Sequence, residues 1–307
     1  MPNLQHQVSR LHRLAVASLA LLAVLACTPA FADAQALHEK YSAQREVLEN
    51  NAFQAPINLI SHVTEDLAQG EVYAVMATPF DTLRAVLSKP DEWCGMIILH
   101  VNIKACTYDT GPDTQMHFYV GHKEYETPDQ AFALQYRFRV TKSSPEELVV
   151  ALSAPQGPLG TRNYRMELEA VPLGAGRSFL HFSYAYNYNW VSRLALDTYL
   201  ATLGRDKIGF TVTGRDDNQQ PIYIKGIQGI VERNSMRYFL AIQATLDTVN
   251  TSPQGSTEMR FNKWYALIQR YPRQLVEYTR EEYLERKRLE YKNQTQLQQT
   301  EKRPSGK

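Results

Sequence analysis

The feature that most constrains this fold is a series of short segments in which apolar and polar residues alternate. Residues 115–120, 132–140 and 164–170 all show the alternation, and turns rich in Gly, Pro and Ser separate them. A period of two is typical of strands that bury one face. The segment 178–188 is apolar and aromatic on both faces, which places it at the centre of a sheet. Short turns between consecutive strands predict an antiparallel meander.

Helical spacing marks the segments on either side of the meander. Thr78-Pro79 supplies a hydroxyl and a first-turn proline to open a helix, and a second short helix carries Trp93. After the meander, apolar residues recur every three or four positions over residues 228–249, which predicts one long helix. A further helix is expected over residues 257–290, with Trp264 in its apolar stripe.

This order of elements resembles the START-like, or SRPBCC, helix-grip superfamily. Residues 70–75 match its early strand, residues 79–83 its proline-opened helix, and residues 90–93 the tryptophan after the second helix. The helix around residues 232–238 completes a resemblance that covers residues 55–250. The resemblance implies an α+β fold in which a long C-terminal helix closes a curved antiparallel sheet. Here an extra C-terminal helix would follow.

The resemblance also implies a cavity between the long helix and the sheet. Members of the superfamily hold lipids, sterols, polyketides or aromatic molecules there, and most of them only bind. We therefore expect an exported binding protein for a hydrophobic or lipid-like small molecule, without a cofactor. One alternative is an enzyme of the cyclase or hydrolase type, with His181 or Glu232 as acid or base. Another is an envelope scaffold that acts through its C-terminal helix.

The N-terminus predicts the compartment. Arg10 and Arg13 precede an apolar run over residues 14–26, and Ala30-Phe31-Ala32 is a small-x-small cleavage site. The run is shorter than the roughly 20 residues that span a bilayer. These features predict a secretory signal over residues 1–32 and a periplasmic or secreted mature chain. The alternative is a lipoprotein acylated at Cys27.

After the signal, we expect a helical segment at 33–54 and a START-like domain at 55–250. A basic helix with a disordered tail would occupy residues 251–307. Net charge is −6 over residues 33–255 and +5 over residues 256–307. Such a basic segment could contact an anionic membrane surface, and a solvated helix is the alternative. Export argues against nucleic acid as a partner.

Two cysteines remain after removal of the signal, Cys94 and Cys106. In an oxidising compartment such a pair forms a disulfide. A loop this short contributes about 3 kcal/mol in the chain-entropy model. Neither cysteine lies in a CxxC motif, which disfavours a redox role.

Candidate ligand-binding residues are the polar and aromatic side chains within apolar elements. An arginine on the long helix could bind a carboxylate or phosphate, whereas the structural alternative is an ion pair such as Arg237 with Glu167. A turn over residues 204–207 with two cations is equally ambiguous. The candidates are Arg162, Tyr164, His181, Tyr184, Glu232, Arg233, Asn234 and Arg237.

The sequence carries no motif for metal binding or nucleophilic catalysis. Its histidines show neither HxH nor HxxxH spacing, which disfavours a zinc site. GxSxG, P-loop and GxGxxG patterns are missing as well. We therefore predict no catalytic residue and no metal ligand.

Overall fold

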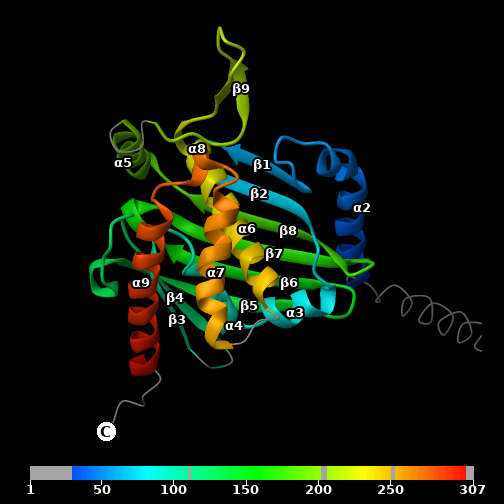
Figure 1. Ribbon diagram of the computed structural model, residues 1–307, viewed down its shortest axis with the longest axis horizontal. Helices are drawn as coiled ribbons and strands as arrows, with labels where there is room; N and C mark the ends of the chain where they lie inside the picture. The colour runs from blue at the N-terminus through cyan, green and yellow to red at the C-terminus, as the bar shows by residue number, and fades with distance from the viewer. Residues whose placement is uncertain (1–29, 110, 112, 202–205, 250–252, 302–307) are drawn as a thin grey trace, which may run out of the picture.

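The structure is a computed structural model that describes residues 30–109, 111, 113–201, 206–249 and 253–301. Cys27 and residues 1–29 of the predicted signal lie outside this part of the chain. One antiparallel sheet of eight strands forms the centre, with helices against both faces (Figure 1). Within the described residues, no helix combines the length and apolar character that a membrane span requires.

The sheet has the strand order β1-β2-β8-β7-β6-β5-β4-β3. β3 to β8 follow one another as an antiparallel meander, and β8 then pairs with β2 of an N-terminal hairpin. The predicted meander is confirmed, although β3 was not predicted. The strands are β1 (Ile57–Val63), β2 (Leu67–Met76), β3 (Ile103–Tyr108), β4 (Gln115–Val120), β5 (Phe132–Ser143), β6 (Leu148–Gln156), β7 (Arg162–Gly174) and β8 (Arg177–Asn187).

A long helix, α6 (Gly226–Thr248), lies across the inner face of the sheet against β1, β2 and β8 (Figure 1). The predicted short helices, α3 (Phe80–Leu87) and α4 (Pro90–Ile97), connect β2 to β3. The apolar side chains of α6 and of the inner sheet face form the main core. This arrangement confirms the predicted α+β helix-grip architecture.

The segment after α6 forms three helices, where the sequence predicted one. They are α7 (Pro253–Ile268), α8 (Pro272–Leu275) and α9 (Arg280–Glu301). Pro272 lacks the N–H that a continuous helix would need. Trp264 is fully buried, and its Nε1 donates a hydrogen bond to the Arg237 carbonyl at 3.1 Å. α7 is therefore docked on α6.

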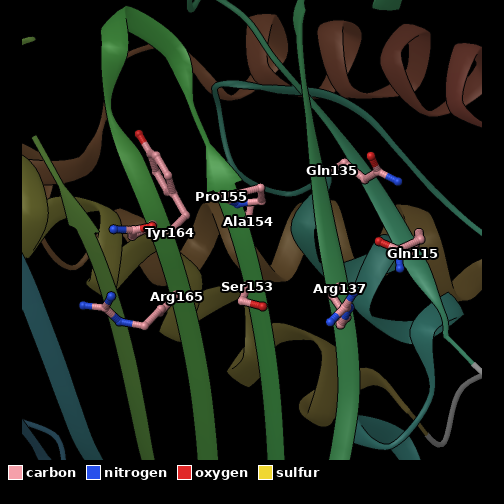
Figure 2. A pocket seen from close by; sticks show the side chains of 9 residues that line it. Gln115, Gln135, Arg137, Ser153, Ala154, Pro155, Tyr164 and Arg165 are labelled. Carbon is pink, nitrogen blue, oxygen red and sulfur yellow. The ribbon is translucent and has the colours of Figure 1, made fainter.

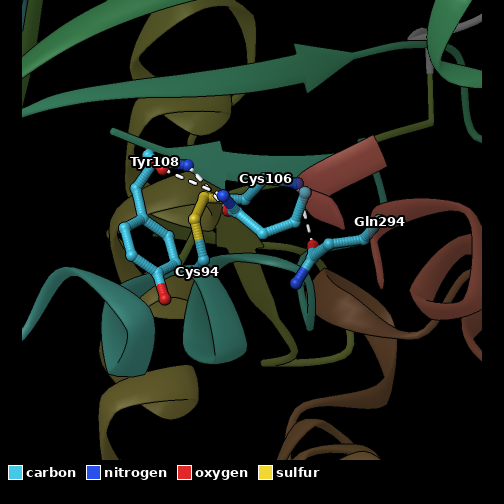
Figure 3. Close-up of a disulfide and its surroundings, with 5 residues drawn as sticks. Cys94, Cys106, Tyr108 and Gln294 are labelled. Carbon is cyan, nitrogen blue, oxygen red and sulfur yellow. Dashed lines mark hydrogen bonds between the residues drawn. A yellow bond between two sulfur atoms is a disulfide. The ribbon is translucent and has the colours of Figure 1, made fainter. Parts of the chain in front are cut away.

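The predicted disulfide between Cys94 and Cys106 is present and joins α4 to β3 (Figure 3). Gln294 of α9 accepts a hydrogen bond from the Cys106 N–H at 2.8 Å. The edge strand β3 is thus held covalently by α4 and covered by α9.

The outer face of the sheet is only partly covered. α2 (Ala30–Glu49) packs there over a small second core formed by Leu37, Leu48, Tyr73, Val171 and Phe179. Between β8 and α6, the chain forms α5 (Trp190–Ala201) and a hairpin of β9 (Val212–Arg215) and β10 (Pro221–Tyr223). The sequence predicted an extended piece and a polar loop where this hairpin forms.

Candidate functional site

Five buried tyrosines gather between the sheet and α6, and we call them the tyrosine cluster. Alternation along each strand places its tyrosines on the inner face. The ring of Tyr184 lies 5.4 Å from that of Tyr238 and 5.8 Å from that of Tyr186, centroid to centroid. The members are Tyr136 of β5, Tyr164 of β7, Tyr184 and Tyr186 of β8 and Tyr238 of α6.

Most hydroxyls of the tyrosine cluster lack hydrogen-bond partners. The Tyr164 hydroxyl lies 2.8 Å from Thr161 Oγ1. No hydrogen bond joins the other four hydroxyls to a described residue, and none of these oxygen atoms is completely inaccessible. An unpaired buried polar group costs about 1–3 kcal/mol, so proteins normally satisfy such groups with protein atoms, water or a ligand. The cluster therefore offers several hydroxyls that a ligand could bind, on side chains that are packed in the apolar core.

The phenols of the cluster are neutral at physiological pH. Burial raises the pKa of Tyr164 to about 12. Burial also raises the pKa of each of the other four above the ordinary value for tyrosine. Neutral phenols can both donate and accept hydrogen bonds. They suit recognition of polar groups on a ligand better than proton transfer near pH 7.

His100 adds one further donor beside the cluster. Its ring stacks on that of Tyr238 at 4.7 Å, and its Nδ1 accepts a hydrogen bond from the Asn102 N–H at 3.1 Å. Burial lowers the pKa of His100 well below its usual value, and the cations of Arg237 and Lys287 lower it further. The neutral ring therefore carries its proton on Nε2, and an interaction with the Asn234 side chain of α6 opposes part of the lowering of the pKa.

A hollow of about 690 Å³ opens where β5 and β6 separate (Figure 2). The β5–β6 ladder ends at the pair Arg137 and Ser153. Pro155 follows on β6 and has no N–H to continue the ladder. Tyr164 lines the hollow and also belongs to the tyrosine cluster, so the two regions adjoin. The lining residues are Gln115, Gln135, Arg137, Ser153, Ala154, Pro155, Asn163, Tyr164 and Arg165.

Of the predicted ligand-binding residues, the structure brings Tyr164 and Tyr184 together in the cluster. It places His181 on the opposite face of the sheet, because residues three apart on a strand point to opposite sides. His181 Nδ1 lies 2.7 Å from Glu169 Oε2, and its Nε2 lies 3.3 Å from Glu71 Oε1. Burial acts to lower the pKa of His181, but the two carboxylates outweigh it and raise the pKa.

The two arginines of α6 are held by one carboxylate. Arg233 and Arg237 lie 2.5 and 2.6 Å from Glu277 Oε1. Arg237 thus pairs with Glu277 and not with Glu167, the partner suggested by the sequence. Lys207, from the predicted cationic turn, lies 2.8 Å from Glu277 Oε2, whereas residues 204 and 205 lie outside the described chain. These contacts tie α6 to the segment after α8.

Glu232 is engaged in a different set of contacts. Its carboxylate accepts hydrogen bonds from the Ser61 hydroxyl at 2.7 Å and from the Thr211 hydroxyl at 2.6 Å. The N–H groups of Phe210 and Thr211 donate to it as well. Glu232 therefore anchors the chain before β9 to α6. Of the remaining candidates, Asn234 is half-buried and Arg162 is exposed at the start of β7.

No group of described His, Cys, Asp and Glu residues has an arrangement that could hold a metal ion.

The cations of the C-terminal helices are partly paired within the fold. Lys287 and Lys104, both buried, contact Glu290, and the exposed Arg288 contacts Glu258. Membrane contact through this segment stays a prediction.

An exposed apolar patch is formed where α5 contacts the short turn η3 (Pro158–Gly160), which leads into β7. Trp190 is 78% exposed, Leu194 is 63% exposed, and Val191 and Leu159 are exposed as well. η3 leads into the start of β7, where Asn163 and Tyr164 line the hollow. The apolar patch is therefore close in sequence to residues that line the hollow.

Tyr136, Tyr238 and His100 of this region were not predicted from the sequence. The alternation of Tyr184 and Tyr186 predicted a core or pocket wall, although only Tyr184 was a binding candidate. Tyr136 alternates in the same way on β5. His100 belongs to no local pattern, because its role depends on contact with a ring on α6.

No protein-family model matches the sequence, and no curated protein is similar to it. Norcoclaurine synthase from Thalictrum flavum shares 15% identity with a TM-score of 0.33, over 48% of this chain and 87% of that one. A START superfamily protein from Mycobacterium smegmatis shares 17% with a TM-score of 0.30, over 46% and 92%. A conserved protein from Geobacillus kaustophilus shares 13% with a TM-score of 0.35, over 58% and 95%. Similarity at this level carries no conclusion about function.

Proposed function

We propose that this protein binds a small, largely hydrophobic molecule in the tyrosine cluster and does not convert it. The observation that carries the proposal is a set of four buried tyrosine side chains whose hydroxyls form no hydrogen bond with a described residue. A few polar groups set in aromatic walls are what small-molecule sites present. A ligand with one or more hydrogen-bonding groups on an apolar body would satisfy them.

The ligand would enter through the hollow between β5 and β6. The supporting observation is Tyr164, which lines the hollow and contacts the ring of Tyr186 at 5.3 Å. Side chains that point into the hollow from the outer face should then control access. Ser153 is exposed there, so a large residue at this position fills the hollow without entering the core.

The groups of the site favour binding over catalysis. An efficient general acid or base has a pKa near the working pH. The cluster tyrosines titrate far above neutrality and His100 far below it. The protonation states of these groups therefore do not change near neutral pH, so they suit hydrogen bonding to a ligand better than proton transfer.

The proposal can be tested with phenyl-naphthylamine, an uncharged apolar probe whose fluorescence rises in dry surroundings. The wild-type chain should bind it saturably at one site, and Ser153→Trp should weaken binding at least tenfold. Ala133→Trp is the matched control, since Ala133 is exposed on β5 and does not line the hollow. Absence of saturable binding would overturn the proposed function. Unchanged binding by Ser153→Trp would overturn the proposed entry.

We also propose that the protein is exported by its N-terminal signal. The support is the basic start, the short apolar run and the small residues before Asp33. Intact mass of the mature protein distinguishes the two routes. A chain that begins at Asp33 indicates signal cleavage, and an acylated chain that begins at Cys27 indicates a lipoprotein. An uncleaved chain would contradict both.

The apolar patch around Trp190 suggests how a lipid-like ligand is exchanged, through contact with a membrane surface. Exposed tryptophan and leucine side chains insert readily at a lipid interface. Sedimentation with phosphatidylglycerol vesicles should show binding that Trp190→Ser with Leu194→Ser abolishes. Loss of binding in Lys292→Glu alone would instead assign the contact to the basic C-terminal helix.

A further inference from the structure

We infer that the hollow is a subsite for an anionic group, and that the ligand is an anionic amphiphile. Its apolar body would occupy the tyrosine cluster, and its carboxylate, sulfonate or phosphate would lie in the hollow. This inference rests on the proposed function and names the class of ligand. It follows from the charges that line the hollow and from their positions on the sheet.

The lining of the hollow contains two arginines, Arg137 and Arg165, and no acidic residue. Neither guanidinium group forms an ion pair or a hydrogen bond with a described residue. Carboxylates do occur on the same face: Glu167 lies two residues from Arg165 on β7 without forming an ion pair with it, and Glu71 and Glu169 flank His181. The two arginines thus form a site of positive charge without a counter-ion from the described chain.

The strand register places these arginines on one row across the sheet. Arg137 of β5 pairs with Ser153 of β6, and Ser153 pairs with Arg165 of β7. Neighbouring strands lie about 4.8 Å apart, so the two arginine Cα atoms are about 10 Å apart. Two long side chains at this separation can converge on one anionic group above Ser153. Guanidinium groups bind carboxylate and phosphate oxygens through paired hydrogen bonds.

Neutral donors complete the subsite. Gln135 and Asn163 also belong to the lining. Ser153 lies between the two arginines and supplies a hydroxyl (Figure 2). Tyr164 connects this polar region to the aromatic interior. The site is therefore polar and cationic at its mouth and aromatic inside, which matches a molecule with a charged head and an apolar body.

A matched pair of probes tests the inference. Anilinonaphthalene sulfonate and phenyl-naphthylamine share one ring system and differ by the sulfonate. The wild-type chain should bind the sulfonate at least tenfold more tightly than the uncharged probe. Arg137→Gln with Arg165→Gln should abolish that preference, because the sulfonate loses its two guanidinium partners. Arg139→Gln is the control, because Arg139 is exposed on the same strand and face but lies outside the lining.

The possible results separate the two proposals. If neither probe binds, the proposed function itself fails. If both bind equally, or the double variant keeps the preference, the anionic subsite is overturned while the binding function stands. Competition with dodecanoate and with short-chain phosphatidylglycerol then distinguishes a fatty-acid carboxylate from a lipid phosphate. Displacement by neither would contradict an anionic amphiphile.

Discussion

Gln298 of α9 pairs with Tyr108 of β3 as a neighbouring strand would. Its Nε2 donates to the Tyr108 carbonyl at 3.0 Å, and its Oε1 accepts from the Tyr108 N–H at 2.9 Å. Gln294, one helical turn earlier, accepts from the Cys106 N–H (Figure 3). Four helical residues advance about 6 Å and two strand residues about 6.8 Å, so the two spacings match. α9 thereby satisfies a sheet edge that would otherwise be open for pairing.

Replacement of both glutamines should expose this edge. In Gln294→Ala with Gln298→Ala, we expect hydrogen exchange at the Cys106 and Tyr108 amides to accelerate more than tenfold, because their acceptors are lost. Gln296→Ala is the control, since Gln296 is exposed on the same helix. Hydrogen-exchange mass spectrometry measures the effect. Equal exchange in the double variant and the control would show that the glutamines do not protect β3.

Removal of an unpaired hydroxyl from the tyrosine cluster should not destabilise the protein. We expect Tyr184→Phe and Tyr238→Phe to leave the free energy of unfolding unchanged or to raise it slightly, since no described partner is lost. Tyr283→Phe should cost about 1 kcal/mol, because its buried hydroxyl donates to the Leu99 carbonyl at 3.0 Å. Urea denaturation compares the three variants. Similar losses in all of them would mean that the cluster hydroxyls are paired.

Glu277 should be essential to stability because three cations depend on it. Glu277→Gln leaves Arg233 and Arg237 buried without a counter-charge, and loss of one partner from such a group typically costs about 3–5 kcal/mol. Glu258→Gln is the control and should have little effect, because its partner Arg288 is exposed. Chemical denaturation at neutral pH measures both. A small loss in Glu277→Gln would contradict the structural role of the ion pairs.

The stabilisation that Glu277 provides should be lost in acid. Burial acts to raise the pKa of Glu277, but Arg237, Lys207 and Arg233 outweigh it and hold the pKa well below the ordinary 4.5. A carboxyl group whose pKa is lowered by folding stabilises the fold at pH values above its unfolded pKa. That stabilisation is lost as pH falls below about 4.5. The wild type should therefore lose stability in acid more steeply than Glu277→Gln. Parallel acid profiles would count against this assignment.

His181 should make stability depend on pH in the opposite direction. Glu71 and Glu169 raise its pKa despite burial, so its contribution is present below pH 6.5 and is lost as pH rises through the folded pKa. His181→Gln removes the titration while it keeps a polar side chain. Melting temperature measured between about pH 6 and pH 9 should fall more in the wild type than in the variant. Identical slopes would show that the charge of His181 is unimportant.

The strands could be predicted where one face of the sheet is buried. On β7, Met166 and Leu168 are buried while Arg165 and Glu167 are exposed, so polarity alone reveals the strand. β3 shows no such alternation, because it is buried on both sides. Its Lys104 is fully buried and lies 3.0 Å from Glu290 of α9, a partner that no local pattern specifies.

The candidate site was predicted less completely for a related reason. The sequence prediction placed His181 and Tyr184 in one site because both are polar side chains in an apolar strand. Strand alternation puts them on opposite faces of the sheet. The partner of Arg237 could not be deduced, because Glu277 comes from a segment of irregular chain after α8. The hollow depends on where the β5–β6 ladder ends, which is a property of strand register rather than of either sequence segment.

The proposed function requires the tyrosine-lined interior to hold a small molecule. Native mass spectrometry of the full chain, isolated from the envelope fraction of its source, tests this most directly. We predict a stoichiometric added mass that solvent extraction identifies as an anionic amphiphile. A protein that carries no added mass, and gains none after incubation with envelope lipids, would contradict the account.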